Sequence, residues 1–159
     1  MENLTGRTIC IIGGCGHVGL PLGVKFALAG AKTFLIDVDP EKIGMVNGGK
    51  FPFLELGGDE QLQVALTRGL LATDDASVTA KADAIVFVTG TPVDEHLNPK
   101  LSGVLEIFDQ YEQYFSDETT IIMRSTLFPG TMENIFNRLR KRGKNVKLAF
   151  CPERVAQGY

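Results

Sequence analysis

Six residues near the N-terminus, Gly14-Cys15-Gly16-His17-Val18-Gly19, place glycine with the spacing G-x-G-x-x-G. Inside a helix or strand, glycine costs roughly 0.5–1 kcal/mol relative to alanine, so this repetition needs a reason. A diphosphate that lies against bare backbone at a helix start provides one, because unpaired N–H groups and the helix dipole attract an anion there. The pattern follows an apolar run and opens a helical one. It therefore predicts a dinucleotide site; the alternative is a purely structural turn.

The three glycines of the pattern are expected to serve different purposes. Gly14 permits the tight turn, Gly16 lets a pyrophosphate approach the backbone, and Gly19 lets the helix pack on the sheet. Cys15, His17 and Val18 complete the expected phosphate loop.

Two residues downstream are candidates for binding the adenosine ribose. Asp37 follows Gly19 by eighteen positions and can accept both ribose hydroxyls while repelling a 2′-phosphate, which favours NAD over NADP. The alternative is that Asp37 caps the helix that begins at Pro40, where Asp39 is an equally good cap. Lys42 either lies beside the same ribose or is an ordinary exposed lysine.

The elements that must position these residues alternate along the chain. Six apolar runs have strand length and are continuous, as strands covered on both faces require: 8–12, 32–37, 69–73, 84–89, 119–123 and 146–150. Five segments between them have helical spacing: 17–29, 40–47, 59–68, 103–115 and 131–142. The alternation predicts an α/β fold, a Rossmann-like doubly wound parallel sheet of about six strands with helices on both faces. Ligands of such sheets bind beyond the carboxyl ends of the strands.

Composition limits the function classes. The 159 residues make one domain, and a net charge of −3, from 16 basic and 19 acidic residues, favours neither nucleic acid nor a membrane as a partner. We expect the basic run at 138–147 to be a solvated helix end. The three cysteines have no metal-ligand spacing, so we expect no metal and a reducing, cytoplasmic location. No run is long enough for a signal peptide or a membrane span.

Three later strand-end loops, "VTGTPVDEH", "RSTLFPGTME" and "CPERVAQG", also carry polar groups. Thr91-Pro92 and Ser125-Thr126 place hydroxyls where the nicotinamide half of a cofactor would pass. Thr131 is a plausible N-cap for the helix that follows. Each loop alone is explained by turn chemistry, but all three on one edge of a sheet favour a site.

Taken in order, these motifs resemble the UDP-glucose/GDP-mannose dehydrogenase family. The matching segments span nearly the whole chain: "GCGHVGLPLG" (14–23), "IDVDPEKI" (36–43), "FPFLELG" (51–57), "TDD" (73–75), "GTPVDE" (90–95), "STLFPGT" (125–131) and "CPERVAQG" (151–158). "CPERV" is more similar to the branch that acts on UDP-N-acetylhexosamines, such as the UDP-N-acetylmannosamine 6-dehydrogenases, than to the UDP-glucose branch.

The resemblance implies an oxidoreductase of nucleotide-sugar metabolism and polysaccharide biosynthesis. Such an enzyme oxidises the sugar C6 hydroxyl to a uronate with two NAD, through a thiohemiacetal and a thioester on a cysteine. Carried over by motif, the NAD contacts are His17, Val18, Asp37, Lys42, Thr91 and Thr126. Glu153 is implied as a general base for the hydrolytic stage, with Thr126 helping to place the water. Arg154 and Val155 are implied to touch the UDP-sugar.

In that family the nucleophilic cysteine, a lysine, an asparagine, the central dimerising helix and the UDP-sugar domain follow the segment that corresponds to residues 1–159. None of Cys10, Cys15 and Cys151 is expected to replace the nucleophile, because no electropositive, accessible thiol is evident. We therefore expect residues 1–159 to be an NAD-binding domain that binds NAD but is inactive alone, in an enzyme that forms a homo-oligomer through the central helix. The alternatives are a free-standing NAD-sensing module and the cofactor domain of another two-domain dehydrogenase.

Overall fold

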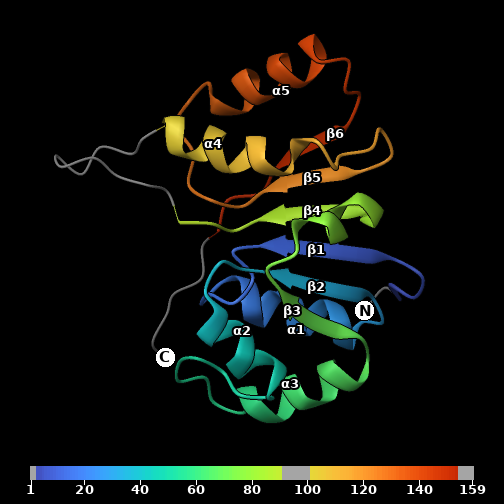
Figure 1. The fold of residues 1–159 in the computed structure, drawn as a ribbon, viewed down its shortest axis with the longest axis vertical. Helices are drawn as coiled ribbons and strands as arrows, with labels where there is room; N and C mark the ends of the chain where they lie inside the picture. Colours follow the sequence, from blue (N-terminus) through green and yellow to red (C-terminus); the bar gives the residue numbers. More distant parts are fainter. Residues whose placement is uncertain (1–2, 91–100, 154–159) are drawn as a thin grey trace, which may run out of the picture.

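A single parallel sheet forms the centre of the molecule. The computed structural model describes residues 3–90 and 101–153. The strands are β1 (Thr8–Ile12), β2 (Lys32–Ile36), β3 (Leu70–Thr73), β4 (Ala84–Phe87), β5 (Thr120–Met123) and β6 (Lys147–Phe150). Their order is β3-β2-β1-β4-β5-β6, and all five neighbouring pairs are parallel (Figure 1). The predicted doubly wound, Rossmann-like sheet is confirmed, with strand positions within two residues of the apolar runs.

Helices cover both faces of this sheet. They are α1 (Gly19–Leu28), α2 (Pro40–Asn47), α3 (Gly58–Thr67), α4 (Leu101–Glu112) and α5 (Thr131–Lys141), with a short 3₁₀ helix, η1 (Ala76–Lys81), that the sequence did not predict. Residues of α1, α2 and α3 pack into one hydrophobic cluster, and residues of α4 and α5 pack into the other. Figure 1 shows the two groups of helices on either side of the strands.

Alternate residues of the strands supply the two clusters. In β1, Ile9 and Ile11 belong to the cluster of α1 to α3, whereas Cys10 and Ile12 belong to the cluster of α4 and α5. Because successive side chains of a strand point to opposite faces, a strand covered on both sides must be apolar throughout. This is why the run "TICII" does not alternate.

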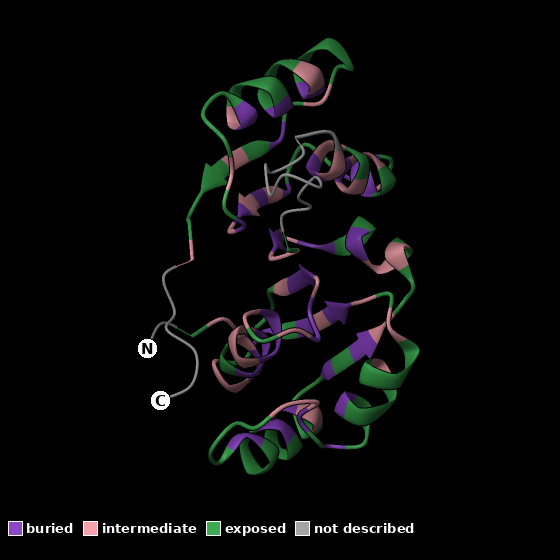
Figure 2. Cartoon of the chain, turned by 90° about the vertical axis from the view of Figure 1, so that its left-hand side faces the viewer, coloured by how far each residue is buried: buried purple, intermediate pink, exposed green. Residues whose placement is uncertain are grey.

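The last strand departs from that expectation. β6 forms one edge of the sheet, and three of its four residues are exposed, with Phe150 47% exposed. The prediction that every apolar run is covered on both faces is therefore wrong for β6, because an edge strand has only one neighbour and α5 covers only part of it. In Figure 2 exposed residues dominate this end of the sheet, whereas buried residues dominate its middle.

The start of α5 also differs from the prediction. Gly130 is the N-cap, with φ +85°, and Thr131 is already the first helical residue. Thr131 makes no capping bond, and its Oγ1 is buried without a partner among the described residues. The predicted Thr131 cap is wrong because the left-handed turn, which suits glycine, occurs one residue earlier.

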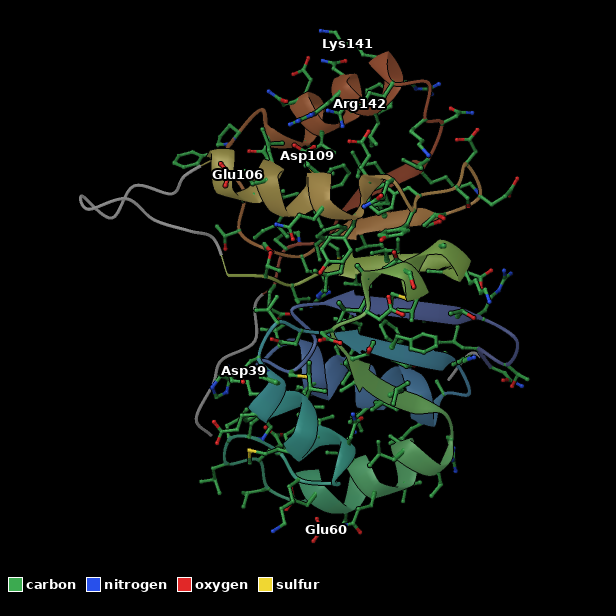
Figure 3. All side chains as sticks on the ribbon, viewed as in Figure 1. Asp39, Glu60, Glu106, Asp109, Lys141 and Arg142 are labelled. Atoms are coloured by element: carbon green, nitrogen blue, oxygen red, sulfur yellow. The ribbon has the colours of Figure 1, made fainter. Side chains whose placement is uncertain are left out.

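The basic run at 138–147, which starts within α5, is not simply solvated. Arg138 forms an ion pair with Asp109 of α4, and Arg142 forms ion pairs with Asp109 and Glu112. Figure 3 shows Asp109 and Arg142 between the two helices, with Lys141 pointing outward. Two cations of the predicted solvated helix end therefore connect α5 to α4.

Candidate functional site

The carboxyl ends of the strands form one edge of the sheet, the edge that faces the viewer in Figure 2. β1 lies between β2 and β4, so the chain leaves β1 and β4 toward opposite faces. Open α/β sheets bind their ligands at this point of reversal. Three loops with sequence-predicted site residues begin there, 13–18, 37–39 and 124–131, and the predicted Glu153 follows β6 at the same edge.

The structural roles of the glycines in the first loop differ from those predicted from the sequence. Gly13, with φ +81°, makes the turn, rather than Gly14. A Cβ on Gly14 would lie 2.7 Å from Leu35 Cα in β2, so this glycine allows the loop to lie against the neighbouring strand. A Cβ on Gly19 would lie 2.6 Å from the carbonyl oxygen of Gly13, so this glycine lets the helix approach the loop rather than the sheet.

Gly16 is different, because the protein itself leaves room for a side chain there. A Cβ on Gly16 would meet only the carbonyl oxygen of Gly13, at an ordinary 3.5 Å. The N–H groups of His17 and Val18 beside it have no acceptor among residues 3–90 and 101–153, and Val18, the N-cap of α1, has no side-chain cap. Exposed backbone and free N–H groups at a helix N-terminus are what an anionic group requires.

Cys15 faces the interior of the protein. Its side chain is buried in the cluster of α1 to α3, and its N–H donates to Asp37 Oδ2 at 2.9 Å. Burial, with a smaller contribution from the charge of Asp37, raises the pKa of Cys15 to about 12. The thiol of Cys15 is therefore enclosed in the core, and its backbone N–H is bonded to Asp37. Cys15 contributes to the site by connecting the glycine loop to Asp37.

The carboxylate of Asp37 is held by backbone N–H groups. Besides Cys15, Val38 N and Asp39 N donate to its Oδ1, at 2.9 and 3.3 Å. A carboxylate offers about four acceptor sites, so roughly one remains for a ligand hydroxyl rather than the two expected from the sequence. The cap of α2 is Asp39, which accepts from Glu41 N at 3.1 Å and Lys42 N at 3.2 Å. The capping alternative for Asp37 is thus wrong.

Lys42 lies beside this carboxylate pair. Its Nζ is 3.2 Å from Asp39 Oδ2, and that hydrogen bond, with a smaller contribution from Asp37, raises the pKa of Lys42. The hydrogen bond from the backbone N–H of Lys42 lowers the pKa of Asp39. Asp39 marks this corner of the edge in Figure 3. The corner therefore carries a charged lysine that is paired with Asp39 and close enough to Asp37 to interact with its charge.

The other half of the edge contains a pocket of about 190 Å³. Its lining includes Val18 from the first loop, Thr89 and Gly90 after β4, Ser125 and Thr126 after β5, and Glu153 after β6. Four sequence motifs that are far apart in the chain therefore meet here.

Ser125 and Thr126 have different roles in this pocket. Ser125 is buried, and its hydroxyl donates to the carbonyl oxygen of Thr89 at 2.6 Å. That bond joins the loops after β4 and β5, so the Ser125 proton is not free for a ligand. Thr126 is exposed and also lines the pocket.

Two residues of the site were missed by sequence reasoning. Arg124 lines the pocket, forms an ion pair with Glu153 and donates to Cys151 Sγ at 3.4 Å. A charged residue at the end of an apolar strand, directly before Ser125-Thr126, was the available signal. The second is Phe53, whose ring lies 4.0 Å from that of His17, centroid to centroid. Nothing in the sequence indicates this ring contact, because it depends on where the segment after α2 lies in the fold.

Four predicted site residues, Thr91, Pro92, Arg154 and Val155, lie outside the described residues. Among those described, no helix is long and apolar enough to cross a membrane.

Comparison with known proteins gives the family. The family model described as "UDP-glucose/GDP-mannose dehydrogenase family, NAD binding domain" matches residues 7–159. A UDP-N-acetyl-D-mannosamine dehydrogenase of Methanococcus aeolicus is 34% identical over 94% of this chain and 34% of its own length. A UDP-glucose 6-dehydrogenase of Rickettsia conorii is 30% identical over 91% of the chain and 34% of its own length.

The fold matches a solved structure of a UDP-D-ManNAc dehydrogenase from Pyrococcus horikoshii, with a TM-score of 0.85 and 26% identity over 94% of this chain and 37% of that one. The chain spans about a third of the length of the curated relatives it matches.

Proposed function

Because this chain belongs to the UDP-glucose/GDP-mannose dehydrogenase family and carries its NAD-binding domain, we propose that it supplies the cofactor half of a nucleotide-sugar 6-dehydrogenase. The observation that carries this proposal is Gly16, where the protein leaves room for a side chain and the sequence omits one. Packing within the protein does not require a glycine at this position. A diphosphate that approaches the backbone and accepts from the N–H groups of His17 and Val18 would require one.

The cofactor is NAD, and the proposed contacts divide between its two halves. Gly16 and the N–H groups of His17 and Val18 bind the diphosphate, while Gly14, Cys15 and Gly19 support the loop that presents them. Asp37 accepts one hydroxyl of the adenosine ribose through its remaining acceptor site and repels a 2′-phosphate. Lys42 lies beside that ribose.

The pocket between the later loops is proposed for the nicotinamide half and the reacting carbon. Thr126 contacts the cofactor there, Ser125 holds the loop, and Thr91-Pro92 are proposed to approach from the loop after β4. Hydride acceptance is the chemistry that bound NAD supplies. Glu153, as a general base, takes a proton from a water that Thr126 helps to place.

The proposed substrate is a UDP-N-acetylhexosamine, oxidised at C6 to a uronate with two NAD. Support comes from "CPERV" and from the relatives named UDP-N-acetyl-D-mannosamine dehydrogenase. Arg154 and Val155 are proposed to touch that nucleotide sugar. Cys10 and Cys15 are buried in the core, so we propose that neither of them is the nucleophilic cysteine.

Replacing Gly16 tests the proposal. Gly16→Ala adds a methyl group that the protein tolerates but a diphosphate does not, so calorimetry should show NAD⁺ affinity lowered by at least about tenfold, or ~1.4 kcal/mol. The thermal unfolding midpoint should stay nearly unchanged, because the new Cβ makes only an ordinary contact.

Gly44→Ala is the matched control. Gly44 lies within α2, nothing lies within 4 Å of a Cβ there, and alanine in a helix adds roughly 0.5–1 kcal/mol of stability. This variant should bind NAD⁺ as the parent does. Equal NAD⁺ affinity in the parent and in Gly16→Ala, or no NAD⁺ binding by the folded parent at millimolar ligand, contradicts the proposal.

A further inference from the structure

We propose that Phe53 is a positioning residue for the cofactor: its ring holds the glycine loop, residues 13–18, in the shape that binds a diphosphate. The inference rests on the proposed function, because it requires the diphosphate of NAD to accept from the N–H groups of His17 and Val18. It gives the segment between α2 and α3 a part in cofactor binding.

The two halves of the glycine loop are held differently. The N–H groups of Gly13 and Gly14 donate to the carbonyl oxygen of Ile36 at 2.9 and 3.0 Å, which anchors the first half to β2. In the second half, the N–H groups of His17 and Val18 have no acceptor within the part of the chain that the structure describes. A glycine-rich loop is also costly to hold in one shape, because glycine loses more conformational freedom than any other residue. A side-chain contact on the second half can therefore decide how often the loop is ready to bind.

A row of three aromatic rings connects this second half to the core. The ring of His17 lies 4.0 Å from that of Phe53, centroid to centroid, with the two planes 31° apart. The ring of Phe53 lies 5.3 Å from that of Phe51, edge to face at 88°. Phe51 is buried in the cluster of α1 to α3, Phe53 is half-buried against it, and His17 is exposed. Phe53 thus links an exposed loop residue to a fixed point inside the protein.

The segment that carries Phe53 is itself attached to α3 and, through α3, to α1. The N–H of Phe51 donates at 2.8 Å to Oδ1 of Asp59, which lies in the first turn of α3. Further along α3, Gln61 Oε1 accepts from Lys25 Nζ of α1 at 2.7 Å. Because α1 starts directly after the glycine loop, these bonds keep the ring of Phe53 and the loop in a constant relation.

A contact of this kind affects affinity without touching the ligand. When a ligand binds only one shape of a loop, its apparent affinity is reduced by the fraction of molecules that have that shape. An aromatic ring pair can change such an equilibrium by roughly two- to tenfold. Loss of the Phe53 ring should therefore weaken NAD⁺ binding although none of the proposed NAD contacts is removed.

The experiment measures the Kd of NAD⁺ for this chain by calorimetry. Phe53→Leu keeps an apolar side chain against the cluster but removes the ring, and it should raise Kd by about three- to tenfold. Phe53→Tyr keeps the ring and should stay within about twofold of the parent. Phe26→Leu is the matched control, because Phe26, in the last turn of α1, is likewise half-buried against the same cluster. It should lower the thermal unfolding midpoint about as much as Phe53→Leu does and leave Kd unchanged.

A double variant distinguishes positioning from a general loss of stability. His17→Ala removes the ring on which Phe53 acts and should also raise Kd, and His17→Ala/Phe53→Leu should bind NAD⁺ no worse than the weaker of the two single variants. A double variant whose Kd rises by the product of the two single factors overturns the inference, as does Phe53→Leu with a Kd within twofold of the parent. If Phe53→Leu does not fold, an unchanged Kd in His17→Ala overturns it alone. A folded parent that does not bind NAD⁺ contradicts the proposed function instead.

Discussion

Each of the three cysteines lies in a different environment. Cys10 is buried in β1 with its Sγ 3.8 Å from the carbonyl oxygen of Val78, Cys15 is buried behind the glycine loop, and Cys151 is exposed beside the Arg124 guanidinium. Burial raises the pKa of Cys10 and of Cys15 to about 12. Cys151 is therefore the accessible cysteine of the three. The Arg124 guanidinium beside it is also paired with Glu153, and it meets Cys151 only because β5 and β6 are neighbouring strands.

Alkylation should follow these environments. At pH 8 iodoacetamide should modify one cysteine per folded chain, Cys151, because the thiolate is the nucleophile and the other two thiols stay protonated and enclosed. In urea all three should react, and mass spectrometry of the peptides identifies the sites. Modification of Cys15 in the folded chain would contradict this assignment.

The same two pKa values have a consequence for stability. In the folded protein the pKa values of Cys10 and Cys15 are raised above the ordinary 9.0. The two protonated thiols therefore make their full contribution to the free energy of unfolding below about pH 9, and this contribution is lost as the pH rises toward 12. Cys10→Ala should reduce this alkaline loss, measured as the urea midpoint at pH 8 and pH 10.

At the scale of elements, α5 begins with an unusual polar residue. Thr131 is buried, and its Oγ1 has no hydrogen-bond partner among the described residues. Thr119, before β5, is equally buried, but its Oγ1 is 3.2 Å from the carbonyl oxygen of Ala82 and 2.9 Å from Ser116 Oγ. The two threonines are equally buried, but only the hydroxyl of Thr119 is hydrogen-bonded among the described residues.

Replacing each threonine by valine should therefore have opposite effects. Thr131→Val should raise the free energy of unfolding by about 1 kcal/mol, because it removes a desolvated hydroxyl that bonds to nothing. Thr119→Val should lower it by about 1–3 kcal/mol, because carbonyl and hydroxyl partners lose their bonds. Urea denaturation measures both; a loss of stability in Thr131→Val would mean that its hydroxyl has a partner.

At the scale of the whole molecule, α4 and α5 are joined by charges as well as by apolar contacts. Glu112 of α4 is only 5% exposed, and Arg142, just after α5, is its ion-pair partner (Figure 3). A carboxylate this deeply buried is costly without a partner. The pair should therefore help to hold α4 and α5 together on the face of the sheet that they cover.

Arg142→Met should destabilise the protein by about 2–3 kcal/mol, because it leaves Glu112 buried and unpaired. Lys141→Met, one residue earlier on the exposed side, should change stability by less than about 0.5 kcal/mol. Thermal unfolding of the two variants provides the comparison, and equal effects would exclude a special role for the pair.

The sequence alone determined the fold class and most element positions. Continuous apolar runs and helical spacing are local patterns, and the runs that became the central strands β1 and β4 are buried on both faces. Gly14, Gly16, Gly19 and Asp37 could be chosen in the same way, because they lie within one short strand–helix–strand unit, β1-α1-β2, with Asp37 directly after its second strand. β6 was misjudged because the composition of a strand does not state whether it lies at an edge.

The way the site is assembled, in contrast, follows from the folded sheet. Three contacts of the site join residues that are 22 to 36 positions apart in the chain: the N–H of Cys15 to Asp37, the ring of Phe53 to that of His17, and Arg124 to Glu153. No local pattern encodes such contacts, because sheet order and register create them. The physical reason is that parallel strands bring their carboxyl ends to one edge, so residues distant in the chain become neighbours only once the sheet has formed.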